Sequence, residues 1–241
     1  MLPALLRRHR PARPVPHERR GVPGGRGFTL VELLVALSVM ALLALVSWRG
    51  LDGMVRAQEQ TRQRGSDLLA LQSALAQWGT DLDALLSLPG TAALDWDGQV
   101  LRLTRRSSAV PDPGALVVGW TRRSVQGQDH WLRWQSLPVR TRAEWQQAWQ
   151  QAAQWARNPG DAERRAEVVL VPLSGWQLFY HRGGAWSNPQ SSTGGSDAAD
   201  AQAGASIPDG VRLQLDLAPG QALVGRITRD WASPLKGGGK S

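Results

Sequence analysis

The residues from Phe28 to Trp48 form an apolar run that carries a single charged side chain, Glu32. As an α-helix this run of 21 residues would be about 32 Å long, which matches the roughly 30 Å hydrocarbon core of a bilayer. The run therefore predicts a transmembrane helix, and it constrains the chain more than any other feature does.

Glu32 lies where a membrane span should tolerate no charge. A charged side chain inside such a helix costs about 2.5 kcal/mol or more on insertion scales, so its presence points to a function and to a cationic partner. The alternative interpretation is a carboxylate near the helix end that reaches the interface or takes up a proton.

The residues before Phe28 form a basic leader. Seven arginines and one glutamate give it six of the eight net positive charges of the chain, and several prolines disfavour a helix. The excess of positive charge predicts a cytoplasmic amino terminus, with the rest of the chain on the outer side. The residues after the leader carry a net charge of only +2, so the high isoelectric point does not predict nucleic-acid binding. The chain has no cysteine, so no disulfide supports the outer domain.

The segment Gly27-Phe28-Thr29-Leu30-Val31-Glu32 and the apolar run after it resemble the class III signal of type IV pilin-like proteins. The resemblance implies that a prepilin peptidase cuts between Gly27 and Phe28 and methylates the new amino terminus of Phe28. It also implies that Glu32, the fifth mature residue, pairs with an amino terminus in an assembled filament. The spacing of four residues predicts that Phe28 and Glu32 share one helix face.

The helical pattern continues beyond the membrane run. Apolar residues recur at intervals of three and four along one face, at Leu68, Leu71, Leu75, Trp78, Leu82 and Leu85. We expect this stripe to pack against a sheet of the same chain, with a partner helix as the alternative. Glycines weaken the helix, and Gly50 and Gly53 predict a flexible joint after the span.

From Asp95 onward short alternating runs indicate antiparallel strands. The expected strands are Gln99 to Arg105, Leu116 to Arg122, Trp131 to Val139, Glu167 to Val171, Gly175 to His181, Val211 to Leu217 and Ala222 to Asp230. A helix is expected from Arg142 to Arg157, with Trp145, Trp149 and Ala152 on one face. The stretch from Asn188 to Pro208 is poor in large apolar residues and is expected to be a mobile loop.

The predicted fold class is α+β, with a long pilin-like N-terminal helix packed on an antiparallel sheet. The expected parts are a cleaved leader (1–27), a transmembrane helix (28–48), an amphipathic helix (49–88), a periplasmic domain (89–231) and a flexible tail (232–241).

Several segments outside the signal are similar to the J-type minor pseudopilins of type II secretion. They are Trp48 to Met54, Trp131 to Trp134, Gly175 to Leu178, Ile207 to Leu213 and Ile227 to Arg229. This resemblance implies a single-pass inner-membrane protein in the tip of a periplasmic filament that exports folded proteins. It also implies several partners: the I-type and K-type minor pseudopilins, the H-type and major pseudopilins, the prepilin peptidase/methyltransferase, the inner-membrane assembly platform and membrane lipid. A minor pilin of a type IV pilus or a DNA-uptake filament is the alternative, since it shares the signal.

The sequence predicts no enzymatic activity, cofactor or metal. The four histidines are scattered, and no His or Cys spacing suits zinc. Asp95-Trp96-Asp97-Gly98 begins like a calcium loop, but Gln99 and Val100 stand where a ligand and a glycine are required, so a hairpin turn is expected. The twelve tryptophans are expected to fill the core, among them Trp120, Trp131, Trp134 and Trp176. A glycan-binding surface of exposed, coplanar tryptophans is the alternative.

Overall fold

The computed structural model describes residues 27–108, 114–190, 207–220 and 223–234. The predicted leader, except Gly27, lies outside these residues, as do most of the predicted mobile loop and of the tail. The chain divides into two compact units, Met1–Val55 and Arg56–Ser241.

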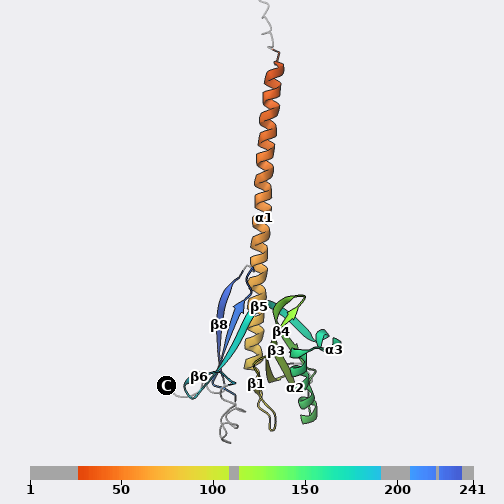
Figure 1. Cartoon of the computed structure of the whole chain (residues 1–241), viewed down its shortest axis with the longest axis vertical. Helices are drawn as coiled ribbons and strands as arrows, with labels where there is room; N and C mark the ends of the chain where they lie inside the picture. The colour runs from red at the N-terminus through yellow and green to blue at the C-terminus, as the bar shows by residue number, and fades with distance from the viewer. Residues whose placement is uncertain (1–26, 109–113, 191–206, 221–222, 235–241) are drawn as a thin grey trace, which may run out of the picture. The chain divides into compact units, whose positions relative to one another are not determined.

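One long helix, α1 (Leu30–Asp83), forms the first element (Figure 1). By length and composition its amino-terminal part can cross a membrane, because its most apolar window has a mean hydropathy of 2.5 and none of it is buried. Ser38, the polar residue in the middle of this part, donates its hydroxyl hydrogen to the carbonyl oxygen of Leu34 at 2.8 Å. The hydroxyl is therefore satisfied within the helix, as a bilayer requires.

The second unit contains an eight-stranded antiparallel sheet, ordered β1-β2-β3-β4-β5-β7-β8 with β6 paired to β5. The strands are β1 (Leu94–Trp96), β2 (Val100–Arg106), β3 (Ala115–Val125), β4 (Gln128–Gln135), β5 (Glu167–Arg182), β6 (Ala185–Ser187), β7 (Gly210–Leu217) and β8 (Gly225–Ala232). Two further helices, α2 (Arg142–Arg157) and α3 (Asp161–Arg165), lie between β4 and β5. The α+β class and the long helix before an antiparallel sheet are as predicted.

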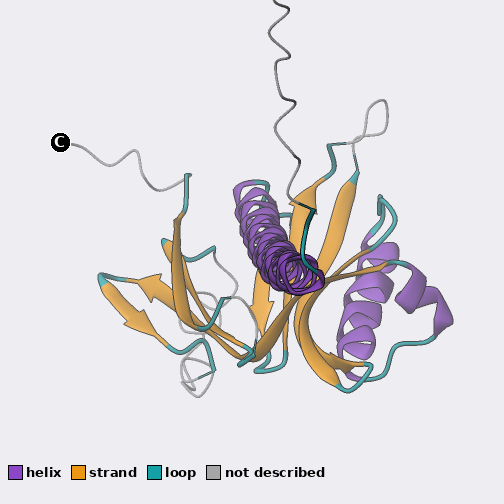
Figure 2. Ribbon diagram, turned by 90° about the horizontal axis from the view of Figure 1, so that it is seen from above, coloured by secondary structure: helices purple, strands orange, loops and turns teal. Residues whose placement is uncertain are grey.

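The end of α1 packs on one face of the sheet (Figure 2). Leu71, Trp78 and Leu82 are buried among side chains of β2, β3, β4, β5 and β7, whereas Leu68 remains exposed. The prediction that the stripe packs against its own sheet is therefore confirmed for its carboxyl-terminal part. This is the larger of the two described cores.

Helix α2 covers the opposite face of strands β2 to β4 (Figure 2). It begins and ends at the predicted residues, and Thr141 caps it by accepting a hydrogen bond from the backbone N–H of Glu144 at 3.2 Å. The Glu144 carboxylate in turn accepts from the N–H of Thr141, which completes a capping box. These backbone hydrogen bonds, led by the one from Arg140, lower the pKa of Glu144.

Helix α1 ends at Asp83, five residues before the predicted end of the amphipathic helix at residue 88. The chain after Asp83 pairs with β2 instead: the N–H of Leu86 donates to the carbonyl oxygen of Thr104, and the N–H of Arg106 donates to that of Ala84. The chain after Asp83 thus continues as backbone paired with β2 and not as helix.

The two predicted strands Glu167 to Val171 and Gly175 to His181 are one continuous strand, β5. Its first part pairs with β4 and its second part with β7, with register shifts near Leu173 and Gly175. Pro172 and Gly175 lie at irregularities inside a strand that joins the two halves of the sheet. The short elements β1, β6 and α3 were not predicted.

Candidate functional site

The predicted processing site lies at the start of the described residues. Gly27, Phe28 and Thr29 precede α1, and the Phe28 side chain is 82% exposed. Thr29 caps the helix, because its hydroxyl oxygen accepts from the N–H of Glu32 at 3.3 Å and its carbonyl oxygen accepts from the N–H of Leu33 at 3.2 Å. The peptide bond before Phe28 thus belongs to an exposed segment outside the helix.

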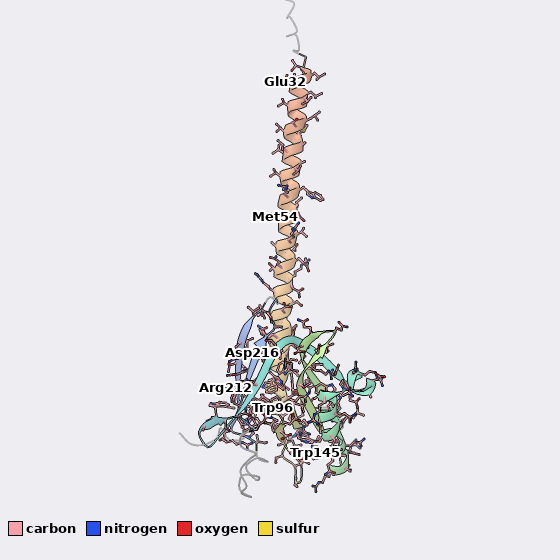
Figure 3. The ribbon with its side chains drawn as sticks, viewed as in Figure 1. Glu32, Met54, Trp96, Trp145, Arg212 and Asp216 are labelled. Carbon is pink, nitrogen blue, oxygen red and sulfur yellow. The ribbon has the colours of Figure 1, made fainter. Side chains whose placement is uncertain are left out.

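Glu32 lies in the first turn of α1, third after the cap, and is exposed (Figure 3). An acidic side chain at this position interacts favourably with the helix dipole. Its carboxylate makes no ion pair or hydrogen bond with any described residue. The expected shared helix face of Phe28 and Glu32 is not present, because Phe28 lies two residues before the helix begins. The unprocessed chain therefore offers Glu32 no cation among the described residues.

A buried charge cluster in the second unit was not predicted. Asp81, on the last turn of α1, is completely buried and lies between Arg105 of β2 and Arg133 of β4. Arg133 donates from Nε and Nη2 to the two carboxylate oxygens at 2.7 and 2.9 Å, and Arg105 donates from Nη1 at 2.5 Å. The Nε1 of Trp120 donates at 3.0 Å and the Nε2 of Gln77 at 2.9 Å. The sequence signal for this cluster was the position of Asp81, which follows Ala74 and Trp78 on the apolar face.

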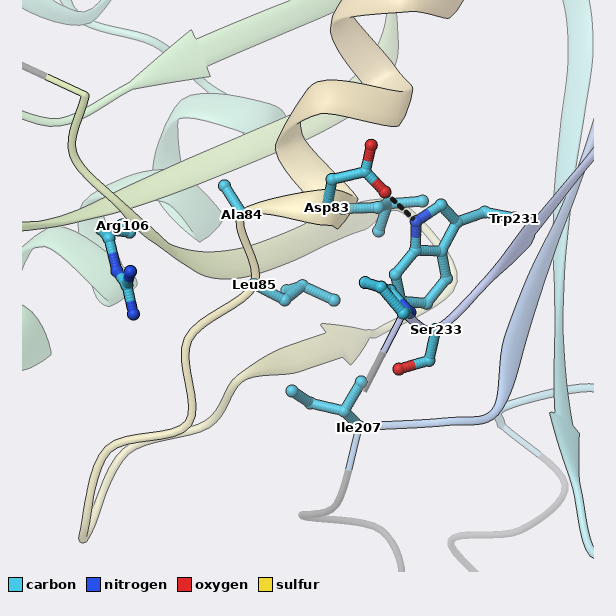
Figure 4. Close-up of a pocket in the computed structure, with 9 residues that line it drawn as sticks. Asp83, Ala84, Leu85, Arg106, Ile207, Trp231 and Ser233 are labelled. Atoms are coloured by element: carbon cyan, nitrogen blue, oxygen red, sulfur yellow. Dashed lines mark hydrogen bonds between the residues drawn. The ribbon is translucent and has the colours of Figure 1, made fainter. Parts of the chain in front are cut away.

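A hollow of about 390 Å³ lies at the carboxyl-terminal end of α1 (Figure 4). Asp83, Arg106, Ile207, Trp231 and Ser233 line it, and Nε1 of Trp231 donates to Oδ1 of Asp83 at 2.8 Å. This hydrogen bond ties β8 to the end of the helix, which is a structural role.

The outer face of β7 and β8 carries ion pairs between neighbouring strands. Arg212 binds Asp230 through two hydrogen bonds of 2.7 Å, and Arg226 binds Asp216 at 2.7 Å (Figure 3 labels Arg212 and Asp216). The hydrogen bond from Arg212 lowers the pKa of Asp230. Such exposed cross-strand pairs add little stability.

The described residues hold no group of three or more His, Cys, Asp or Glu side chains that could bind a metal ion. The suspected calcium-loop residue Asp97 instead accepts from the N–H groups of Gln99 and Val100 at 2.9 and 2.8 Å, which makes a turn between β1 and β2. The predicted hairpin turn is therefore confirmed.

Most tryptophans lie in the core, as predicted. Trp120, Trp131 and Trp134 are buried and Trp176 is partly buried, whereas Trp48 and Trp186 are exposed. Trp78, Trp120 and Trp131 form one packed cluster, with ring centroids 4.5 to 5.6 Å apart. The described part of the chain carries no surface of several exposed, coplanar tryptophans that could bind a glycan.

Comparison with known proteins addresses the amino-terminal segment most directly. Residues 24–48 match the prokaryotic N-terminal methylation motif. The chain is also 35% identical over 60 residues to type II secretion system protein J of Klebsiella pneumoniae, and this region covers 25% of the chain and 30% of the relative. The chain therefore spans less than a third of the relative that it matches. The chain thus carries a prokaryotic N-terminal methylation motif at the start of a helix that could cross a membrane, and over a quarter of its length it is similar to type II secretion system protein J.

Proposed function

We propose that this chain is a minor pseudopilin of the type II secretion system, located in the tip of a periplasmic filament. The observation that carries this proposal is the methylation motif on an exposed apolar helix in a chain that resembles protein J. In this role the chain is a structural subunit and not an enzyme. Its carboxyl-terminal domain faces the periplasm, and its helix remains in the inner membrane until the filament assembles.

The proposed processing follows from the accessible segment before the helix. A prepilin peptidase on the cytoplasmic side would cut between Gly27 and Phe28 and methylate the amino group of Phe28. The inner-membrane assembly platform would then extract the helix from the lipid. The apolar helices of neighbouring subunits would pack together, which keeps their exposed side chains away from water.

We further propose that Glu32 pairs with the methylated amino terminus of a subunit in the filament. Its carboxylate has no partner among the described residues, and an unpaired charge in an apolar bundle is costly. Glu32→Ala should therefore insert into the membrane normally but fail to enter filaments. Ser38→Ala is the matched control, because it removes a polar group from the same helix without removing a charge. Undiminished secretion by the Glu32→Ala chain would contradict the pairing.

The proposed partners are the I-type and K-type minor pseudopilins, with the H-type and major pseudopilins deeper in the filament. The test expresses residues 51–241 with the soluble domains of the I-type and K-type pseudopilins and of the minor pilins from the same genome. Co-elution with the I-type and K-type domains is the expected result. Co-elution with the minor pilins alone would assign the chain to a type IV pilus or a DNA-uptake filament.

A further inference from the structure

The buried cluster around Asp81 contains more positive than negative charge. The side chains of Arg105 and Arg133 are only 7% and 11% exposed, and Asp81 is the one carboxylate that they contact among the described residues. Removing charges from water is costly unless each is compensated. Among the described residues one guanidinium charge has no carboxylate partner, although the ring of Trp120, 5.9 Å from the Arg133 guanidinium, compensates it in part.

The Asp81 carboxylate cannot accept further hydrogen bonds from the second guanidinium group. Its two oxygens accept five hydrogen bonds, from Gln77, Arg105, Trp120 and twice from Arg133. A carboxylate offers about four lone-pair positions. Among the described residues Nη2 of Arg105 and Nη1 of Arg133 make no hydrogen bond, so each keeps donors for another acceptor.

A hollow of about 460 Å³ lies beside these two guanidinium groups. Its other polar lining comes from hydroxyl and amide side chains, and no acidic residue lines it among those described. The full lining is Gln77, Thr80, Arg105, Ser107, Ser108, Leu116, Arg133, Gln135, Ser136, Leu137 and Pro138. The site therefore has the charge and the donors to bind a carboxylate.

The rim of the hollow is apolar and exposed. Leu137 is 85% exposed, and together with Pro138 it separates this hollow from a second one of about 460 Å³ beside α2. Arginine is enriched at protein interfaces, and complementary charges there fix the register and select the partner. An exposed apolar ridge beside two arginines therefore favours a protein partner. A small inorganic anion would make no apolar contact with Leu137 and Pro138.

We propose that this hollow, here named the Arg105–Arg133 pocket, binds an acidic side chain of a partner protein, whose carboxylate neutralises the surplus guanidinium charge. Apolar residues on either side of that acidic residue would pack on Leu137 and Pro138. The inference does not depend on which filament contains the chain.

The test uses the full chain in detergent micelles and two blocked peptides, acetyl-Leu-Glu-Leu-amide and acetyl-Leu-Gln-Leu-amide. Nuclear magnetic resonance follows the side-chain Nε signals of Arg105 and Arg133 and the backbone signal of Leu137. The glutamate peptide should shift these signals saturably, and the glutamine peptide should bind about tenfold more weakly, since a hydrogen bond to a charged group contributes about 1.5 kcal/mol or more. Equal affinity for the two peptides would overturn the proposal.

Arg105→Gln should remove the preference for glutamate. It leaves Asp81 paired with Arg133 and makes the cluster neutral, so we expect it to fold. Arg106→Gln is the matched control, because it removes the same charge from the next residue, which is exposed and lines a different hollow. A preference that persists in Arg105→Gln would contradict the proposal.

A second pair of variants keeps the test decisive if Arg105→Gln does not fold. Leu137→Asp adds a competing carboxylate at the rim and should abolish binding of the glutamate peptide, whereas Leu137→Asn should weaken it only slightly. Both changes affect an exposed side chain and should leave the fold intact. Binding of inorganic phosphate in preference to the glutamate peptide would assign the pocket to a free anion and refute a protein partner.

Discussion

Asp81 joins three elements through its carboxylate, namely α1, β2 and β4. Its replacement would leave two guanidinium groups in a nearly closed environment with no counter-charge. Removal of one partner of a buried ion pair costs about 3–5 kcal/mol, because the remaining charge is uncompensated. Asp81 therefore contributes strongly to the packing of α1 against the sheet.

Asp81→Asn should lower the free energy of unfolding by about 3–5 kcal/mol, measured by urea unfolding of residues 51–241. Asp83→Asn is the control, since Asp83 is exposed and its amide oxygen could still accept from Trp231. We expect the control to cost less than about 1 kcal/mol. Equal effects of the two substitutions would show that the cluster adds no stability beyond a surface carboxylate.

At the residue scale the sequence predicted which tryptophans are buried but missed the charges among them. Large apolar side chains follow the period of their element, so Trp120, Trp131 and Trp134 could be assigned to the core. The partners of Asp81 lie 24 and 52 residues away along the chain. Only the strand register brings them together, and the register was not predicted.

Helix α1 is continuous through Gly50 and Gly53, which the sequence suggested as a flexible joint. A Cβ atom at either position would meet nothing within 4 Å, so neither glycine is required by packing. Each glycine weakens a helix interior by about 1 kcal/mol relative to alanine. The expectation of local flexibility on the time scale of hydrogen exchange therefore remains a prediction.

The double variant Gly50→Ala/Gly53→Ala should slow hydrogen exchange at residues 49–54 by about 10–30-fold in detergent, as two favourable alanines stabilise the helix by about 2 kcal/mol. Gly65→Ala is the control, because Gly65 is equally open but lies twelve residues beyond Gly53. It should leave exchange at 49–54 unchanged. Wild-type protection at 49–54 equal to that at 68–85 would rule out the joint.

The bounds of α2 were easier to predict than those of β5. The capping residues and the apolar face of α2 lie close together in the sequence, so its bounds could be predicted from local signals. The sequence predicted two separate strands where the structure has the single strand β5. It is continuous because β4 supports its first part and β7 its second, and such long-range pairing leaves no local signal.

In the second unit as a whole, two cores lie on opposite faces of strands β2 to β4. Gly119 of β3 permits the close approach of α2, because a Cβ atom there would lie 3.0 Å from the ring of Trp155. The small residue at position 119 thus allows α2 to pack on the sheet. Which face of the sheet α2 covers could not be inferred from the sequence, because that depends on the strand register. The amino-terminal motif, in contrast, is entirely local and could be recognised from sequence.

We propose that Gly27, Phe28 and Glu32 belong to a prepilin-type signal, so that this chain is a filament subunit. The most direct test is the mass of the mature amino-terminal peptide, purified from membranes of cells that express the full chain and its own prepilin peptidase. The account predicts a peptide that begins at Phe28 and carries one added methyl group, and an unprocessed, unmethylated chain for Gly27→Leu. A wild-type chain that retains residues 1–27, or a Gly27→Leu chain with the normal mature mass, would contradict it.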